Sequence, residues 1–248
     1  MIAALGWTWG CDIPPATALS PPPITTLRWY PSDVLPRDGT VLLEIDAALD
    51  PYSLLGSDVA VRSGDRQLGA SLRYDPVWRT LYIDPVPELL DPDVDYVFFV
   101  DGPTSFDGRR LGPSTFRLRV TEALATPGPD PVRFEEVRRA LSGCEPCHGP
   151  ERAVLGLDVT DLRGTAVGVP AEEVRAAAFG PALVGTQRIE PHHPERSYLL
   201  YKMLGEGPIV GDVMGAADTP GVSLSRTDVG VISRWIAEGA HVDDRVEP

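Results

Sequence analysis

The spacing of apolar residues changes near the middle of the chain, at a stretch rich in proline and glycine. Over residues 27–122 apolar and polar residues alternate, most clearly where Phe116, Leu118 and Val120 share one face. Alternation with a period of two is typical of half-buried β-strands. Beyond the proline-rich stretch the apolar residues recur every three or four positions, which is typical of amphipathic helices. One chain therefore holds a β part and a helical part.

These patterns predict a multidomain fold class, with an N-terminal all-β sandwich and a C-terminal all-α domain. The final helix has a capping box at Ser225 and ends at Gly239. Strands are predicted over 40–46, 80–84, 96–100 and 114–120, and helices over 132–141, 196–204 and 225–239, with a short one near 170–179. The predicted domains are a tether over 1–26, the β-sandwich over 27–122, a linker over 123–131 and the helical domain over 132–242.

Composition supports two folded cores and argues against one class of partner. The chain has 248 residues, of which 43% are hydrophobic and 23% charged, so it is not a disordered polymer. Its formal net charge is −14. A surface of that sign repels phosphate backbones, so we expect no nucleic-acid partner. A basic protein partner would be favoured.

The first residues are apolar and lead to a lone cysteine, Cys11, directly after Gly10. The stretch carries no basic residue and is too short to span a membrane. It is similar to the end of a bacterial lipoprotein signal, although Trp7 and Trp9 stand where smaller residues are usual. Two interpretations stay open: an exported chain lipidated at Cys11, or a processed or mis-started terminus. Membrane contact is expected only through that lipid.

The motif with the most specific chemistry is Cys144-Glu145-Pro146-Cys147-His148. Two cysteine thiols one helical turn apart can add to the two vinyl groups of a porphyrin, and the next residue then offers an imidazole to the iron. A thioredoxin-like motif would need a βαβ setting, and a structural zinc site would need about four ligands. We therefore predict one covalent haem c, with His148 as the proximal iron ligand.

The distal ligand has more than one candidate. Met214 lies in a loop before the last helix, the position expected of a thioether ligand, whereas Met203 lies in an amphipathic segment that suits core packing. His192 and His193 in a turn would give a bis-histidine site instead. His241 follows the last helix and is expected at the surface. Met214 is the preferred distal ligand.

The β part resembles the bacterial Ig-like domains of exported and surface proteins. The resemblance rests on a Pro36-Arg37-Asp38-Gly39 turn before a strand and on Leu90-Asp91-Pro92-Asp93-Val94-Asp95-Tyr96 before the apolar strand, followed by Asp101-Gly102-Pro103 and Phe106-Asp107-Gly108. It covers about ninety residues of the chain. It implies a spacer or adhesion module and no catalytic centre.

The helical part, from Phe134 to Ala240, resembles the small c-type cytochrome domains of exported proteins in myxobacteria and planctomycetes. The matching pieces, in order, are residues 144–148, 155–158, 188–202, the Met214 loop and 224–240. The chain departs from the family where Gly215 follows the methionine in place of proline, and where His192-His193 replaces Gly-Asp.

The resemblance also implies how the helical part is built. Its first and last helices would cross over the haem edge, with Phe134 and Trp235 near the crossing. Arg188 and Tyr198 would lie within reach of a haem propionate. A redox partner protein is implied as well, and the sequence does not name it.

Taken together, these features predict an exported electron carrier in the periplasm or at the outer membrane or cell surface. The chain carries no acid–base pair or nucleophile of its own, so it is not expected to be an enzyme. Two alternatives stay open. One is a haem enzyme or sensor with peroxidase-like activity, should the distal position be empty, and the other is a surface adhesion or structural protein.

Overall fold

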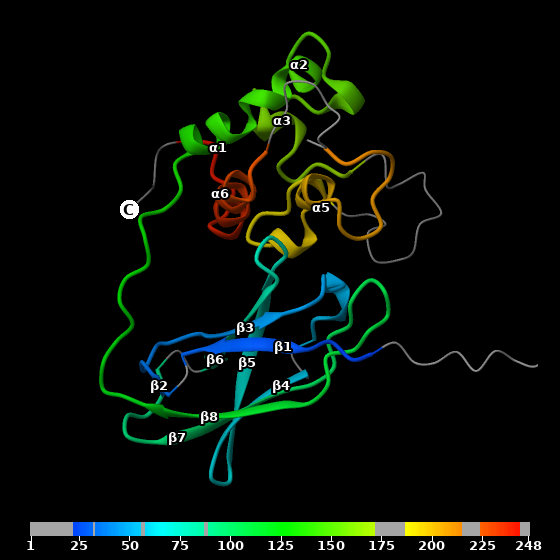
Figure 1. The fold of residues 1–248 in the computed structure, drawn as a ribbon. Helices are drawn as coiled ribbons and strands as arrows, with labels where there is room; N and C mark the ends of the chain where they lie inside the picture. Colours follow the sequence, from blue (N-terminus) through cyan, green and yellow to red (C-terminus); the bar gives the residue numbers. More distant parts are fainter. Residues whose placement is uncertain are drawn as a thin grey trace, which may run out of the picture.

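The structure is a computed structural model that describes residues 22–31, 33–55, 58–86, 89–171, 187–214 and 224–243. A curved β-sheet forms one end of the molecule, and a group of short helices forms the other (Figure 1). The segment between the last strand and the first helix runs along the outside of the molecule. Cys11 and the short helix expected near 170–179 lie outside the described residues, apart from positions 170 and 171.

The strands form a single eight-stranded sheet in the order β1-β3-β6-β5-β4-β7-β8-β2. Neighbouring strands are antiparallel except β2 and β8, which are parallel. The strands are β1 (Thr26–Tyr30), β2 (Val34–Leu35), β3 (Val41–Ile45), β4 (Val59–Ser63), β5 (Arg66–Asp75), β6 (Thr80–Val86), β7 (Asp95–Val100) and β8 (Ser114–Val120). The predicted strands at 40–46, 80–84, 96–100 and 114–120 are confirmed as β3, β6, β7 and β8.

The sheet curls around one apolar core. Alternate residues of β3 and β8 point inward and are buried, as the period of two requires. Inside the curl, Phe98 stacks on Phe116 with ring centroids 5.6 Å apart, and Phe116 stacks on Trp29 of β1. These rings bring β1, at one edge of the sheet, against β8 near the other, so aromatic packing draws the curl together.

The helical part consists of short elements joined by long connections. They are α1 (Phe134–Leu141), η3 (Ser142–Cys144), α2 (Glu145–His148), η4 (Val154–Gly156), α3 (Leu162–Thr165), η5 (Pro194–Arg196), α5 (Tyr198–Leu204) and α6 (Arg226–Ala237), and the 3-10 turn η1 (Pro51–Ser53) belongs to the β part. The predicted helices near 132–141, 196–204 and 225–239 are confirmed. None of the described helices is long and apolar enough to cross a membrane.

The predicted fold class, a two-sheet sandwich followed by an all-α domain, is wrong. The ten-residue strand β5 pairs with β4 through Arg66–Leu68 and with β6 through Gly69–Asp75, so it joins what would be two sheets into one. The described helical part is not a large all-α domain either, because its helices are short and it contains β-bridges at Val167–Ile189 and Pro170–Gln187. The division of the chain into four domains stays a prediction.

The β5–β6 turn joins the two parts of the molecule. It points from the sheet toward the helices (Figure 1), and Val77 at its tip is fully buried in the helical core. Arg226, at the start of α6, donates through Nε to the Val77 carbonyl oxygen at 2.9 Å and lies over the Trp78 ring. Two turns further along α6, the hydroxyl of Ser233 donates to the Asp75 carboxylate at 3.2 Å.

Asp75 gives the junction a pH dependence. Burial raises the pKa of its carboxyl, against the lowering effect of hydrogen bonds from the Val77 and Trp78 amides and Ser233. A raised folded pKa means that the folded protein binds this proton more tightly than the unfolded chain does. The contribution of Asp75 to stability is therefore fully present at low pH and is lost as pH rises through the raised pKa.

We expect Asp75→Asn to remove this dependence. The free energy of unfolding of the wild type relative to the variant should fall as pH rises from about 4 to about 7, because only the wild type must then bury a charge. Urea unfolding across that range measures it. Asp107→Asn is the control for which we expect the opposite pH dependence of stability. The hydrogen bond from the Ser105 hydroxyl lowers the pKa of exposed Asp107. A difference between wild type and Asp75→Asn that stays constant with pH would contradict the assignment.

Candidate functional site

The three residues of the cysteine–histidine motif lie on one continuous helical run. Helix α1 passes into η3 and then into α2, so the backbone stays helical from Phe134 to His148. Cys144 ends η3, while Cys147 and His148 end α2. Positions three apart on a helix share a face, so the two cysteines lie one turn apart on the same side. This is the spacing that addition to two porphyrin vinyl groups requires.

Both thiols are free and half-buried. Cys144 packs against the helical core, and burial, with a smaller contribution from the neighbouring Cys147, raises the pKa of its thiol. A thiol with a raised pKa is a poor nucleophile, because the thiolate is the reactive form and less of it is present at neutral pH. The environment of Cys144 therefore does not resemble that of a thioredoxin-type redox cysteine, whose pKa is lowered.

The chain turns sharply after His148. A Cβ on Gly149 would lie 2.7 Å from the Glu145 carbonyl oxygen, so the turn has room only for glycine. The amide of Val159 then donates to the His148 carbonyl oxygen at 2.7 Å. This hydrogen bond connects the end of α2 to the segment that follows it. The backbone around His148 is thus held from both sides, and its imidazole is half-buried.

The segment after the turn is strained and held by a buried arginine. Ala153 and Leu155 both have positive φ angles, of 35° and 55°, which is uncommon for residues with a side chain. The guanidinium of Arg188 donates to the carbonyl oxygens of Leu155, Gly156 and Thr165, and Arg188 is only 5% exposed. Arg188, expected within reach of a propionate, is therefore occupied in fixing this loop.

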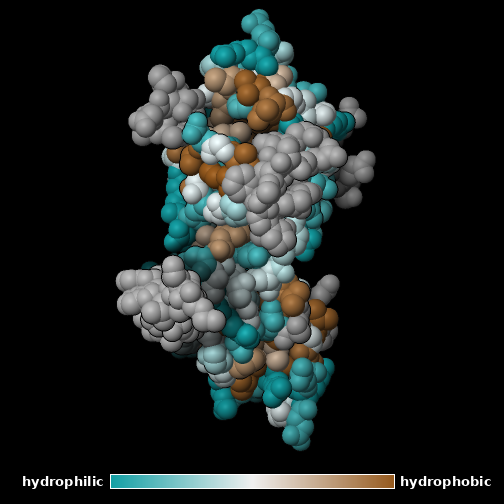
Figure 2. Space-filling view, turned by 90° about the vertical axis from the view of Figure 1, so that its right-hand side faces the viewer, coloured by the Kyte–Doolittle hydropathy of each residue, from teal (hydrophilic) through white to brown (hydrophobic). Residues whose placement is uncertain are grey.

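The strained segment presents apolar side chains to solvent. Val154 is 40% exposed and Leu155 is 63% exposed, in the loop that leads on from the attachment helix. Figure 2 shows apolar side chains gathered near the top of the helical lobe, at the level of α2 in Figure 1.

Met214 and Met203 have different surroundings. Met203 on α5 is buried in the helical core, which confirms the core interpretation of that residue. Met214 is half-buried and packs against the same core cluster as Cys144. Its amide donates to the Lys202 carbonyl oxygen at 2.8 Å, so the loop returns to α5 at this point. Gly215, where the chain departs from the family pattern, lies outside the described residues.

The histidines proposed as alternative ligands have local partners. Nδ1 of His193 lies 2.9 Å from the carboxylate of Glu195, and Nδ1 of His192 lies 3.4 Å from the Ala237 carbonyl oxygen. The indole of Trp235 donates to the carbonyl oxygen of His241 at 2.8 Å. The first and last helices contact each other as expected, because Phe134 on α1 lies against Trp235 on α6 with ring centroids 5.9 Å apart. Their position at a haem edge stays a prediction.

Sequence reasoning missed Lys202. It lies in the buried face of α5, is 7% exposed, and contacts the loop that leads to Met214. A signal was present, because Lys202 is the only charged residue in the run Tyr198–Leu204. Tyr198 accepts a hydrogen bond from the Val210 amide in that same loop, and its expected place near a propionate stays a prediction.

Over the described parts of the chain, no group of three or more His, Cys, Asp or Glu side chains is placed to hold a bare metal ion. A haem site does not need such a group, because the porphyrin itself binds the iron and the protein adds axial ligands. The haem prediction rests on the cysteine–histidine run and Met214.

Comparison with known proteins adds little to these observations. No protein-family model matches the chain, and no curated protein matches it. Among solved structures, the N-terminal part of the bacterial S-layer protein SbsC aligns at 12% identity with a TM-score of 0.34, over 44% of this chain and 25% of that one. A structure of SbsC domains 1–6 aligns at 12% identity with the same TM-score, over 14% of its length. Similarity this low does not identify the protein.

Proposed function

We propose that this chain is a c-type cytochrome that carries one covalent haem and transfers electrons. The observation that carries the proposal is the helical run that ends in Cys144, Cys147 and His148, with both thiols free and on one face. When bound, the haem supplies an iron that exchanges one electron between its ferric and ferrous forms. The protein's part is to attach, ligate and bury it.

The residues present fit the group. Cys144 and Cys147 would hold it covalently, His148 would be the proximal ligand and Met214 the distal one. Cys144 and Met214 contact the same apolar cluster, which includes Trp235, Leu199 and Met203. An apolar surround lowers the local dielectric constant and keeps water from the iron, and a soft thioether favours the ferrous form, so both features tune the reduction potential.

Support for an exported location comes from the sequence alone. The apolar start before Cys11 is typical of secreted or surface proteins. We infer that the protein is a periplasmic or cell-surface electron carrier. More specifically, we propose that a lipid attached at Cys11 anchors it to a membrane. With a formal net charge of −14, the preferred redox partner is a basic protein.

The distal ligand distinguishes two kinds of haem protein. An electron carrier has both axial positions of the iron filled, whereas a haem enzyme or sensor has one of them open. Ferric haem c with a methionine ligand has a weak long-wavelength absorption band. We expect that band in the matured wild type and its loss in Met214→Ala, with a lower reduction potential, because water or a weaker ligand replaces the thioether. Met203→Ala is the matched control, since Met203 is a buried methionine in the core, and it should retain the band. An unchanged spectrum in Met214→Ala would contradict this ligation.

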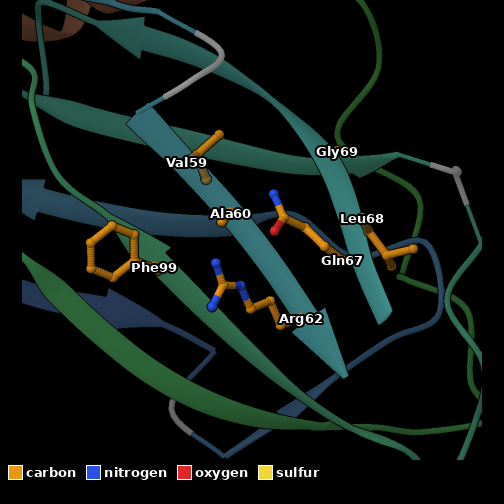
Figure 3. A pocket seen from close by; sticks show the side chains of 7 residues that line it. All are labelled: Val59, Ala60, Arg62, Gln67, Leu68, Gly69 and Phe99. Carbon is orange, nitrogen blue, oxygen red and sulfur yellow. The ribbon is translucent and has the colours of Figure 1, made fainter. Parts of the chain in front are cut away.

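A second candidate function is surface adhesion or a structural role. One observation favours it: the sheet is hollowed beside β4, where Val59, Ala60, Arg62, Gln67, Leu68, Gly69 and Phe99 line an open depression of about 670 Å³ (Figure 3). Ala60 and Phe99 are partners across β4 and β7. A binding screen with the full chain and with Phe99→Asp tests it. Partner binding that requires Phe99 but not haem would favour this function over electron transfer.

A further inference from the structure

Lys202 is a charged side chain in an apolar position. On α5 it lies between Tyr201 and Met203, and all three are buried. Removing an ammonium group from water costs several kcal/mol unless oxygen acceptors replace its hydration. Lysine also loses considerable side-chain entropy when it is fixed. A buried lysine on this face therefore needs acceptors close by.

The acceptors come from the loop that leads to Met214. Nζ of Lys202 donates to the carbonyl oxygen of Val210 at 2.8 Å and to that of Asp212. The carbonyl oxygen of Lys202 in turn accepts from the amide of Met214 at 2.8 Å. The side chain and backbone of one residue thus hold three positions of the loop, the last of which is the candidate iron ligand.

The loop has little structure of its own that would do the same. It contains Gly205, Gly207 and Gly211, all with positive φ, and glycine loses more freedom on ordering than any other residue. Within the loop, the amide of Ile209 donates to the carbonyl oxygen of Gly207, two residues earlier in the chain. Tyr198, one helical turn before Lys202, adds a hydrogen bond to Val210. The segment is ordered by α5 and, nearer its start, by the ion pair of Glu206 with Arg79 at 2.7 Å. Close to Met214, polar contacts with the loop come from Lys202.

We propose that Lys202 is a positioning residue that holds the Met214 loop in the arrangement needed for iron ligation. The inference rests on the proposed function, because it takes Met214 as the distal ligand. Lys202 acts through the backbone of the loop and does not itself touch the haem iron. Neutralising it leaves the carbonyl groups of Val210 and Asp212 without this donor, so that only the backbone bond from the Met214 amide remains of the three contacts.

Lys202→Met tests the inference, since methionine has a similar length and no ammonium. In the matured holoprotein we expect the methionine-ligation band to weaken by at least half, and amide hydrogen exchange over residues 209–214 to quicken by roughly tenfold or more. Arg226→Met is the matched control, because it also removes a cation that donates to a carbonyl oxygen, that of Val77, away from this loop. It should keep both the band and the slow exchange.

The outcomes separate the two proposals. A wild type without the band overturns Met214 ligation and the role of Lys202 together. A wild type with the band, and a Lys202→Met variant that keeps the band and the slow exchange, overturns only the role of Lys202. Should Lys202→Met not accumulate as folded protein, Lys202→Gln takes its place, because its amide can still donate to one carbonyl group. We then expect an intermediate loss of the band, and full retention would overturn the inference.

Discussion

Cys144→Ala/Cys147→Ala is expected to abolish covalent haem completely. Each thioether joins one cysteine sulfur to one porphyrin carbon, so without both thiols no bond to the chain remains. Both thiols are free and share one helical face, so each is available for that bond. Intact-protein mass spectrometry of the matured chain should show the mass of one haem on the wild type and none on the double variant.

Two further variants sharpen this result. Cys11→Ala is the matched control, because it removes the remaining cysteine and should leave the haem mass unchanged. His148→Ala should leave the thioethers possible but change the spectrum, because it removes the proximal ligand. Haem mass on the double variant, or its absence from a wild type produced with the maturation machinery, would contradict haem attachment at this motif.

Trp235→Ala is expected to lower the free energy of unfolding by about 3–5 kcal/mol. Trp235 is 1% exposed, lies in the contact between α1 and α6, and donates its indole hydrogen to His241. Alanine would leave a large cavity and an unpaired carbonyl group, and the contact with Phe134 would be lost. Because α1 continues into the cysteine motif, the same variant should loosen the haem site.

The measurement is urea unfolding of the variant and of Trp29→Ala. Trp29 is also a tryptophan with a stacked ring partner, Phe116, but it is 42% exposed. Its replacement should therefore cost clearly less, about 1 kcal/mol. Equal losses for the two variants would mean that the α1–α6 contact is not a main source of stability.

Several local features could be predicted because they depend on neighbouring residues in the chain. The alternation of Phe116, Leu118 and Val120 predicts the buried face of β8, and the Ser225 capping box predicts the start of α6. The Cys144–Cys147 spacing needs only one helical turn. Each of these patterns spans fewer than about ten residues, within which backbone geometry relates spacing to direction.

The pairing of strands could not be predicted in the same way. A period of two shows which face of a strand is buried, but it does not show which strands lie beside it. The length of β5 allows it to pair with both β4 and β6, and this turned an expected two-sheet sandwich into one sheet. The burial of Val77 among the helices likewise depends on a contact between distant segments.

The sequence by itself determined the chemistry offered at Cys144, Cys147 and His148, because a spacing of three residues on a helix is a local property. Only the tertiary structure decided what Arg188 and Lys202 do. Each lies among carbonyl groups from other segments, and long polar side chains are buried only where such acceptors converge. Arg188 thus fixes the loop beyond the attachment helix, and Lys202 holds the loop that ends at Met214.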